Sequence, residues 1–408
     1  MKTSDSIETA KPLDGVRVLD LATFVAAPFA ATILGEFGAE VIKVEHPDGG
    51  DPMRRFGTAT EEPNLTLAWL SEARNKHSVT LNLKSSDGAQ QFKELVRRSD
   101  VVCENFRPGT LEKWGLGWEV LRELNPRLVL LRISGYGQDG PYRDRPGFAR
   151  IAHAVGGLTY LAGMPDGPPV TPGSTSLADY ISGLYGAVGI LLALREVERS
   201  GGGQVIDVAL FESIFRVLDE LAPLFAKHGI VRAPEGTGTR NACPHGHFVC
   251  ADGKWVAIAC TADRIWARMA SNVLGKPELA LSHPATATRL ADRDTIESAV
   301  EMFTKSHTMS EVVAMCTEGD VPCGAINSIE DIFADEQFAT RGVLTEVIHD
   351  TLGKIVIPNV LPRLSKTPGE IRALGPSLGD WDGERLAALL DDDSQVRDID
   401  RVSGERNP

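Results

Sequence analysis

The first 135 residues alternate between short apolar runs and segments whose apolar residues recur every three or four positions. Short apolar runs are typical of buried β-strands, and the second pattern is typical of helices that bury one face. A proline near the start and a glycine just past the end mark a helix over Pro28–Phe37. A second helix is expected over Ala89–Arg98, with Ser86 or Asp87 as its cap. The predicted strands are Val16–Leu21, Glu40–Val44, Ser78–Leu83, Asp100–Glu104 and Leu128–Ser134.

This alternation predicts parallel strands joined by crossover helices, which is a Rossmann-like α/β arrangement. A long apolar helix is expected over about 177–199, and Gln204–Leu210 returns as a strand. After about Phe225 the pattern changes to a hairpin around Ala251–Lys254, followed by helical segments. The predicted domains are a large Rossmann-like domain over 12–225, a smaller α+β domain over 226–335, and a C-terminal return to the large domain over 336–408.

Composition and charge narrow the classes of function. The chain has 408 residues, 42% of them hydrophobic, which is enough to bury a large core in two lobes. Its formal charge of −14 argues against a nucleic-acid or anionic-membrane surface, because those partners need a positive field. The apolar stretch Tyr180–Leu194 is too short to span a bilayer, and nothing marks the N-terminus for export, so we expect a cytoplasmic protein. Six cysteines without a repeated spacing indicate reduced thiols.

Several sequence blocks occur in one order between Pro12 and about Leu390. They are PLDGVRVLDL, GEFGAEVIKVEHP, RNKHSVTLNLK, ENFRPGTLEKWGLG, ISGYGQDGP, and ADYISGLYGAVGILLAL with GGGQVIDVAL. In this order they resemble the class III CoA-transferases, the family of formyl-CoA transferase and carnitine CoA-transferase. The resemblance implies the same α/β fold with a smaller second domain. It also implies a homodimer whose two chains are interlocked like linked rings.

In that family an aspartate at the start of the long apolar helix is the nucleophile, and Asp179 matches its place. The resemblance implies that its carboxylate attacks the thioester carbonyl of an acyl-CoA and that the reaction passes through an aspartyl-CoA thioester. The substrates would be an acyl-CoA and a free carboxylic acid, with no cofactor bound. The alternative is that Asp179 only caps the helix.

The resemblance also implies where CoA binds. Lys84, Arg107 and Lys113 would supply the positive charge that an acidic chain must concentrate around the CoA phosphates. The run GYGQDG spells a dinucleotide fingerprint, but the prolines after it prevent the required helix, so we expect no nicotinamide cofactor. The residues matched to CoA contacts are Val25, Ala26, His46, Leu81, Asn82, Leu83, Lys84, Asn105, Phe106, Arg107, Lys113, Ser134, Gly135, Tyr136 and Gly137.

The sequence departs from formyl-CoA transferase near the expected acyl site. Val25 and His46 stand where that enzyme has a glutamine and an arginine, and its four-glycine loop is absent, so oxalate and formyl-CoA are not expected as substrates. The segments 146–157, 169–180 and 242–248 look most like the subgroup that uses succinyl-CoA with malate, citramalate or itaconate. A dicarboxylate needs a cation or strong donor for its distal carboxylate. The candidates are Arg54, Arg55, Arg150, Arg240, His245 and His247.

The sequence argues against two other functions. A 2-methylacyl-CoA racemase needs a second acid/base, which those relatives supply as Gly-His-Asp, whereas this chain has Gly147-Phe148-Ala149. A non-catalytic CoA-binding protein is the other alternative, and the intact block around Asp179 argues against it. The segment Cys243–Cys250 holds two cysteines and two histidines, but their spacing fits no zinc ribbon or finger, so we expect no metal.

Overall fold

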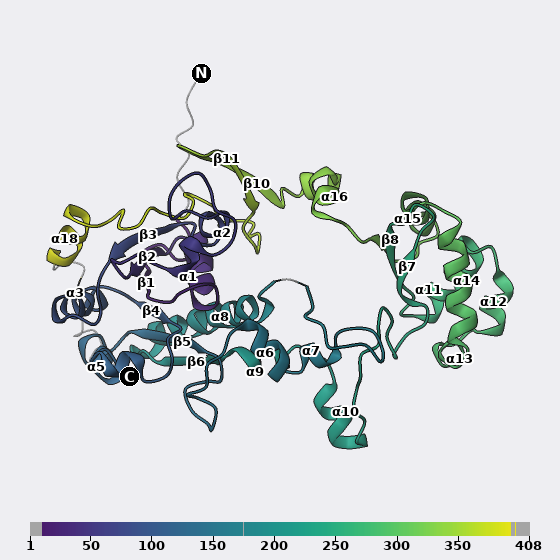
Figure 1. The fold of residues 1–408 in the computed structure, drawn as a ribbon, viewed down its shortest axis with the longest axis horizontal. Helices are drawn as coiled ribbons and strands as arrows, with labels where there is room; N and C mark the ends of the chain where they lie inside the picture. Colours follow the sequence, from purple (N-terminus) through teal and green to yellow (C-terminus); the bar gives the residue numbers. More distant parts are fainter. Residues whose placement is uncertain (1–9, 174, 393–395, 397–408) are drawn as a thin grey trace, which may run out of the picture. The chain divides into compact units, whose positions relative to one another are not determined.

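The computed structural model describes residues 10–173, 175–392 and 396. The chain divides into two compact units (Figure 1). The first unit takes its described residues from Met1–Leu158, Gly173–Asp219 and Gly342–Pro408. The second consists of Thr159–Pro172 and Glu220–Arg341. The chain therefore passes from the first unit into the second and back twice.

The first unit is built on a six-stranded parallel sheet, which confirms the predicted α/β arrangement. The strand order is β3-β2-β1-β4-β5-β6, the order of a doubly wound Rossmann sheet. Every neighbouring pair is parallel. In such sheets ligands bind beyond the carboxyl ends of the strands, where the order reverses, which is here between β1 and β4. The strands are β1 Arg17–Asp20, β2 Glu40–Glu45, β3 Lys76–Thr80, β4 Val101–Glu104, β5 Val129–Ser134 and β6 Val205–Ala209.

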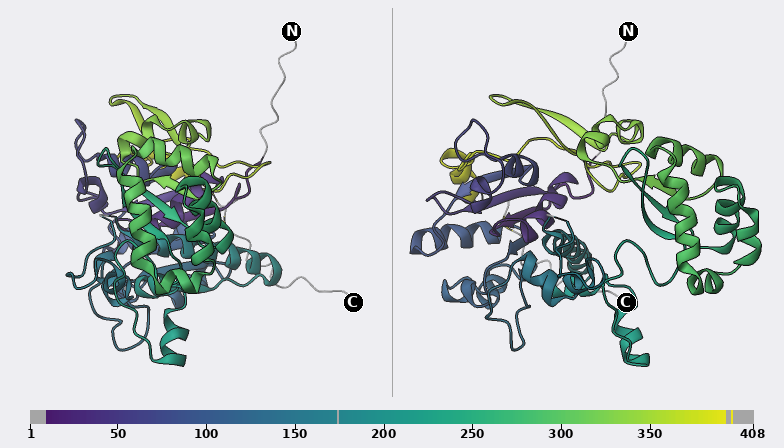
Figure 2. Two further views of the ribbon diagram at one scale, coloured as in Figure 1. Left: turned by 90° about the vertical axis from the view of Figure 1, so that its right-hand side faces the viewer. Right: turned by 45° about the vertical axis from the view of Figure 1, so that its right-hand side comes forward.

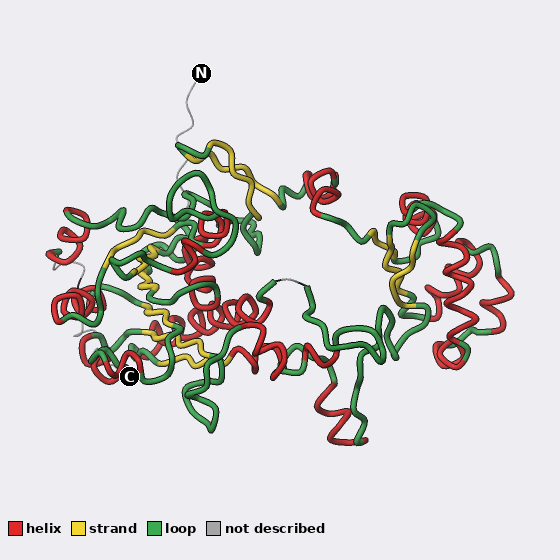
Figure 3. Tube along the Cα trace, viewed as in Figure 1, coloured by secondary structure: helices red, strands yellow, loops and turns green. Residues whose placement is uncertain are grey.

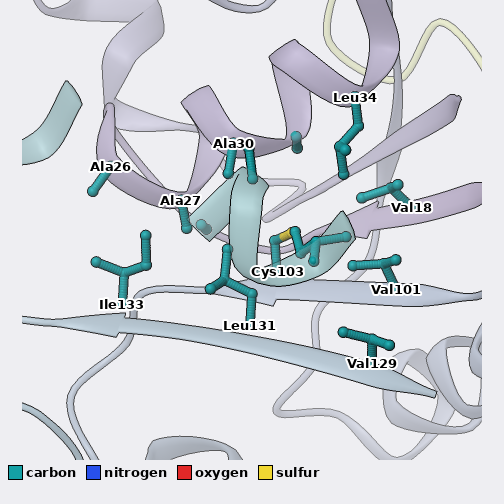
Figure 4. Packing of buried hydrophobic residues seen from close by; sticks show 14 of the residues in the cluster. Val18, Ala26, Ala27, Ala30, Leu34, Val101, Cys103, Val129, Leu131 and Ile133 are labelled. Carbon is teal, nitrogen blue, oxygen red and sulfur yellow. The ribbon is translucent and has the colours of Figure 1, made fainter. Parts of the chain in front are cut away.

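Helices cover both faces of this sheet. One face carries α1 Ala26–Glu36 and α8 Leu177–Ser200, and the other carries α3 Ser86–Arg97, α5 Trp118–Leu124 and α18 Glu384–Asp391. Figure 4 shows the small side chains of α1 packed above Cys103 and Leu131 of the sheet. α8 approaches α1 closely because glycine stands at the contact. A Cβ at Gly183 would lie only 2.6 Å from the carbonyl oxygen of Ala26.

Within the described residues, α8 is the one helix long and apolar enough to cross a bilayer. The helix is longer than its uncharged apolar stretch Tyr180–Leu194. The argument that this stretch is too short to span a bilayer therefore does not hold for the whole helix. Gly186, Ile190 and Ala193 on one face are buried against α1 and the sheet. This packing is typical of a core helix in a globular protein.

The C-terminal segment lies along the edge strand β3. The Trp381 N–H donates to the carbonyl of Ser78 at 2.9 Å, and Asp382 accepts the Thr80 N–H at 2.8 Å. Hydrogen bonds therefore fasten residues 381 and 382 to β3. The other elements of this unit and its border are η1 Pro52–Arg55, α2 Leu67–Glu72, α4 Thr110–Lys113, α6 Ala149–Val155, α7 Leu158–Leu161, α9 Leu210–Phe215, β10 Leu344–His349 and β11 Gly353–Pro358.

The second unit combines an antiparallel sheet with helices (Figures 2 and 3). The hairpin expected around Ala251–Lys254 is confirmed, since it joins β7 to β8. Trp266 and Val256 lie in a separate hydrophobic core. The elements are β7 His245–Val249, β8 Trp255–Ala259, β9 Cys323–Ala325, α10 Leu221–His228, α11 Asp263–Arg268, η2 Met269–Val273, α12 Pro277–Ser282, α13 Thr286–Ala291, α14 Arg293–Lys305, α15 Met309–Glu318, α16 Ile329–Ala334 and α17 Glu336–Thr340.

Two local details of the first unit differ from the sequence expectation. The cap of α3 is Ser85, whose hydroxyl accepts the Gly88 N–H at 3.1 Å, and not Ser86 or Asp87. The third strand ends at Thr80, so residues 81–83 form a loop at its carboxyl end. This loop therefore reaches the edge of the sheet where ligands are expected.

Candidate active site

A cavity of about 230 Å³ lies beyond the carboxyl ends of β1, β4 and β5. Its walls come from the loops after these strands, from a loop that ends at Phe148, and from the first turn of α8, which contributes Asp179. The structure thus gathers loops that are far apart in sequence around one carboxylate. The predicted CoA-binding residues that line this cavity are Val25, Ala26, Asn105, Phe106, Arg107, Ser134 and Gly135.

Asp179 lies in the first turn of α8, whose N-cap is Ser176. Its carboxylate has no hydrogen-bond or ion-pair partner among the residues that the structure describes, and burial alone raises its pKa to about 6. The geometry does not fit the alternative role as a cap, because the carboxylate accepts no N–H from the helix end. Asp179 is therefore a partly buried carboxylate without a partner among the described residues.

His153 on α6 holds the turn that carries Asp179. Its imidazole is 1% exposed, and Nε2 accepts the N–H of Ala178 at 3.0 Å. Burial, and then the positive charge of Arg150, lower the pKa of His153, which favours the neutral ring. Since Nε2 accepts a hydrogen bond, the proton of the neutral ring lies on Nδ1. Because α6 begins directly after Phe148, one helix connects the cavity wall to the turn that carries Asp179.

Residues 22–24, just before α1, form a strained part of the cavity wall. Phe24 has φ = +61°, a left-handed conformation that costs a bulky residue roughly 1–3 kcal/mol. Its N–H donates to Asp51 Oδ1 at 3.1 Å. Asn105 accepts the N–H of Thr23 at 2.8 Å and donates its amide to the Thr23 carbonyl at 2.7 Å. Side chains from two other loops thus fix this backbone.

A network of four buried charges lies behind that segment. Lys43 Nζ is 3.0 Å from Asp51 and 3.5 Å from Asp20, and Lys76 Nζ is 2.8 Å from Asp20. Burial alone would lower the pKa of Lys43, but the carboxylates of Asp20, Asp51 and Glu45 raise it to about 12. Lys43 also donates to the carbonyl of Ala22. Since breaking a buried pair costs about 3–5 kcal/mol, the network supports the strained wall firmly.

The loop after β5 forms another wall of the cavity. Gly135 and Gly147 touch each other, since a Cβ on Gly147 would lie 3.0 Å from the Cα of Gly135. This close backbone approach, which favours glycine, fixes the loop to the end of β5. The loop brings Arg143 and Arg145 into the cavity wall, and sequence reasoning missed both. Their only signal was a basic pair in a proline-bounded loop, which looks like ordinary surface charge.

A second cavity of about 120 Å³ shares Thr23 and Phe106 with the first. It lies beyond the carboxyl ends of β1, β2 and β3, and its walls are mainly apolar. The Lys84 ammonium lies 6.0 Å from the ring centre of Trp114. An apolar slot with a cation beside it suits a flat base that carries phosphate. The predicted CoA-binding residues that line it are His46, Leu81, Asn82, Leu83, Lys84 and Phe106.

Three of the predicted CoA-binding residues line neither cavity. Lys113 ends α4 and precedes Trp114, whose ring lines the second cavity. The Gly137 N–H donates to Ser134 Oγ at 2.9 Å and so closes the turn after β5. Tyr136 packs against neighbouring aromatic rings. The turn residues thus shape the first cavity from behind its wall.

The candidates for the distal carboxylate are divided between the two units, and none of the three in the first unit lines the Asp179 cavity. Arg54 is 1% exposed and donates to both carboxylate oxygens of Glu45, at 2.8 and 2.6 Å. Its guanidinium therefore forms an ion pair with Glu45 and does not line the Asp179 cavity. Arg55 donates to the carbonyl of Gly49, and Arg150 is exposed on α6.

The other three candidates, Arg240, His245 and His247, belong to the second unit. Arg240 pairs with Glu235 at 2.7 Å. His247 lines a polar cavity of about 280 Å³ in that unit, which is acidic and suits no anion; its other charged lining residues are Asp294, Glu297 and Glu301. Within the described ranges, no group of three or more His, Cys, Asp or Glu is placed to hold a metal ion.

Comparisons with known proteins agree with this architecture. The sequence pattern described as "CoA-transferase family III" matches residues 13–381. The succinyl-CoA–L-malate CoA-transferase beta subunit of Chloroflexus aurantiacus is 55% identical over 400 residues, which cover 97% of this chain and 98% of that one. The succinyl-CoA–D-citramalate CoA-transferase of the same organism is 41% identical over 96% and 98% of the two chains.

Among solved structures, a CaiB/BaiF family protein from Brucella suis has a TM-score of 0.82 and 33% identity, covering 94% of this chain and 100% of that one. The similarity therefore extends over both units, and over the turn that carries Asp179. On the extent of these matches, the chain belongs to CoA-transferase family III and is a class III CoA-transferase.

Proposed function

We propose that this enzyme transfers CoA from succinyl-CoA to malate or citramalate through an aspartyl-CoA thioester on Asp179. The observation that carries the proposal is the partly buried Asp179 carboxylate, which has no partner among the described residues. It lines a cavity that shares two wall residues with the apolar second cavity. A carboxylate that ionises near pH 6 and carries no ion pair is a competent nucleophile. The named activities of the two relatives support succinyl-CoA as the donor and a dicarboxylate as the acceptor.

The proposed reaction conserves the thioester bond. An Asp179 oxygen attacks the thioester carbonyl of succinyl-CoA, the C–S bond breaks, and a mixed anhydride and CoA thiolate form. The thiolate attacks the aspartyl carbonyl and releases succinate, which leaves an aspartyl-CoA thioester. A malate carboxylate then attacks that carbonyl and displaces the thiolate. The thiolate finally attacks the malyl carbonyl of the new anhydride, which gives malyl-CoA and restores the Asp179 carboxylate.

Each attack places negative charge on a carbonyl oxygen. α1 begins at Ala26, which lines the cavity, so the partly positive N-terminus of a helix lies at the reaction site. Such a fixed dipole stabilises a developing oxyanion without reorganisation. The rigid segment before α1 would thus support the electrostatics of the reaction as well as the shape of the cavity.

The positive charges in the cavity wall support a dicarboxylate substrate. Arg107, Arg143 and Arg145 line the cavity and can pair with a distal carboxylate or a CoA phosphate. Succinyl-CoA should therefore exceed acetyl-CoA and butyryl-CoA in kcat/KM by roughly a hundredfold, or about 3 kcal/mol. Among acceptors, malate and citramalate rank first, itaconate next, and formate, oxalate and carnitine last. Carnitine is disfavoured because its quaternary ammonium would meet the same arginines.

The proposed assembly is an interlocked homodimer. Leu184, Val188 and Leu192 on the outer face of α8 are 51%, 53% and 68% exposed, and a second chain would cover them. The chain also leaves the first unit and returns to it, which would let two chains thread through each other. Interlocked chains cannot separate without unfolding, so light scattering should find no monomer on dilution. A monomer peak that grows on dilution would contradict this assembly.

Asp179→Ala is the direct test of the covalent route. The variant should bind succinyl-CoA and lose CoA transfer by roughly a thousandfold or more, because no other group replaces the nucleophile. Asp350→Ala, at the exposed β10–β11 turn, is the matched control and should keep full activity. Wild-type enzyme given succinyl-CoA without acceptor and then hydroxylamine should be modified on a peptide that contains Asp179. Transfer at the wild-type rate in Asp179→Ala would refute the mechanism.

The donor preference is tested separately. Succinyl-CoA, acetyl-CoA and butyryl-CoA are compared at fixed malate, and the expected difference is the hundredfold preference given above. Equal kcat/KM values for acetyl-CoA and succinyl-CoA would refute the dicarboxylate pocket. The chemistry on Asp179 would stand in that case, since it does not depend on the acyl tail.

A further inference from the structure

Three phenylalanines meet at the Asp179 cavity. The ring of Phe24 packs edge to face with Phe56, at 5.7 Å and 86°, and with Phe148, at 6.3 Å and 85°. Phe24 and Phe148 line the cavity together with Asp179, while Phe56 and Phe148 are more than half exposed. An aromatic wall, made of Phe24, Phe56 and Phe148, thus runs from the cavity to the protein surface.

The position of Phe24 is imposed by its surroundings. Its left-handed backbone would be unstrained in glycine, yet the chain carries a large ring there. Asp51 accepts a hydrogen bond from the Phe24 N–H. Asp51 is itself 3% exposed and forms an ion pair with Lys43. Residues held in rarely populated conformations by their surroundings cluster at functional sites. The strain therefore indicates a role for the ring at the cavity.

The wall at Phe148 is fixed by different elements. Phe148 is the N-cap of α6, and the glycine before it touches Gly135 at the end of β5. On the same helix, His153 holds the Ala178 N–H beside Asp179. Two independently fixed rings therefore lie in the same cavity as the reacting carboxylate. Neither ring offers a group that could act as an acid or base.

We propose that the aromatic wall keeps water away from the activated forms of Asp179 and thereby sets the ratio of CoA transfer to hydrolysis. This inference rests on the proposed covalent route. The anhydride and the thioester on Asp179 are electrophiles that water can attack as well as a carboxylate can. Apolar ring surfaces neither bind nor orient water, so a wall of rings slows the reaction of water more than that of a carboxylate held by the arginines.

The reaction that the wall suppresses is hydrolysis of the activated forms of Asp179. A water oxygen forms a C–O bond to the aspartyl carbonyl, and the C–S bond to CoA breaks. One proton of that water goes to the CoA sulfur, and the other is lost from the new Asp179 carboxyl group. Attack on the anhydride instead gives succinate, the Asp179 carboxylate and free CoA thiol. In both cases the thioester is lost without transfer.

Phe24→Gly is the most informative variant, because it removes the ring and relieves the backbone strain together. Its thermal stability should equal or exceed that of the wild type. Its ratio of hydrolysis to transfer, measured as free CoA released against malyl-CoA formed, should rise by roughly tenfold. Phe148→Ala should change the ratio in the same direction through another element. Phe215→Ala, a half-exposed phenylalanine that does not line the cavity, is the matched control and should leave the ratio unchanged.

Oxygen-18 water identifies where the water reacts. In Phe24→Gly given succinyl-CoA without acceptor, the peptide that contains Asp179 should gain 2 Da through attack on the aspartyl carbonyl. The double variant Asp179→Ala/Phe24→Gly should show no added hydrolysis, and added hydrolysis there would overturn the proposal. An unchanged ratio in both Phe24→Gly and Phe148→Ala would also overturn it. Either result would leave the covalent route intact, provided that Asp179→Ala alone still abolishes transfer.

Discussion

The substitution Asp179→Asn keeps the shape of the side chain and removes its charge. In the folded protein, burial raises the pKa of Asp179 from 3.8 to about 6, which corresponds to roughly 3 kcal/mol against the ionised form. Asparagine escapes that penalty but leaves a buried amide without partners, at roughly 1 kcal/mol. The charge term is the larger. The variant should therefore be more stable than the wild type by about 2 kcal/mol at neutral pH, while it loses CoA transfer.

The stability gained by Asp179→Asn should decrease as the pH falls. Above pH 6, Asp179 is ionised in both folded and unfolded protein, so the wild type bears the whole penalty. Between pH 6 and 4 the folded carboxyl group takes up a proton before the unfolded one does, so the penalty shrinks. Below pH 4 both states are protonated, and the variant has no advantage from charge.

Thermal unfolding of the wild type and the variant at pH 7.5 and 4.5 measures this difference. If the chain unfolds as one unit, about 2 kcal/mol corresponds to roughly 2 °C in Tm at pH 7.5. Asp350→Asn, which removes an exposed charge at the β10–β11 turn, should give no such shift. A variant less stable than the wild type at pH 7.5, or a gain that persists unchanged at pH 4.5, would refute the assignment of an unpaired buried carboxylate.

Other consequences of the site concern pH, Arg54 and His153. The kcat/KM for succinyl-CoA should fall as pH drops below about 6, since protonated Asp179 is no nucleophile, and a profile flat to pH 5 would contradict this. Arg54→Met should lower the unfolding free energy by about 3–5 kcal/mol, because it leaves Glu45 buried and without its ion-pair partner. A changed KM for malate at unchanged stability would instead place Arg54 at the substrate. His153→Phe should reduce kcat more than it changes KM, because the Ala178 N–H loses its acceptor, and steady-state kinetics with a wild-type kcat would show that the turn needs no such support.

The parallel sheet could be predicted because its signals are local. Val41, Ile42 and Val44 form a short apolar run that is buried on both sides, as β2 requires. Asp179 could be placed at the start of a helix from its own neighbourhood. Its reactivity could not, since an aspartate in a first helical turn is commonly only a cap, and the resemblance was needed to choose between the two roles. Only the three-dimensional structure shows that this carboxylate has no partner in the described part of the chain.

The arginines could not be sorted from the sequence because their roles depend on distant partners. Arg54 is paired with Glu45, which lies on another element. Arg143 lines the cavity because its loop is fixed where Gly135 and Gly147 touch. The left-handed backbone of Phe24 is equally hidden, since a positive φ would be expected at glycine. Such features arise from long-range packing, and no local pattern in the chain encodes them.

The buried charged residues of the first unit differ from Asp179 in whether they have ion-pair partners. Lys43, Lys76 and Arg54 are buried, and each is paired with a carboxylate. Asp179 has no such cation among the described residues, although three arginines line its cavity. A cation in contact would lower the pKa of Asp179 and stabilise the carboxylate, which would weaken it as a nucleophile. In the proposed mechanism, the supporting charges are paired while Asp179 has no partner among the described residues, so its carboxylate stays basic enough to attack a thioester.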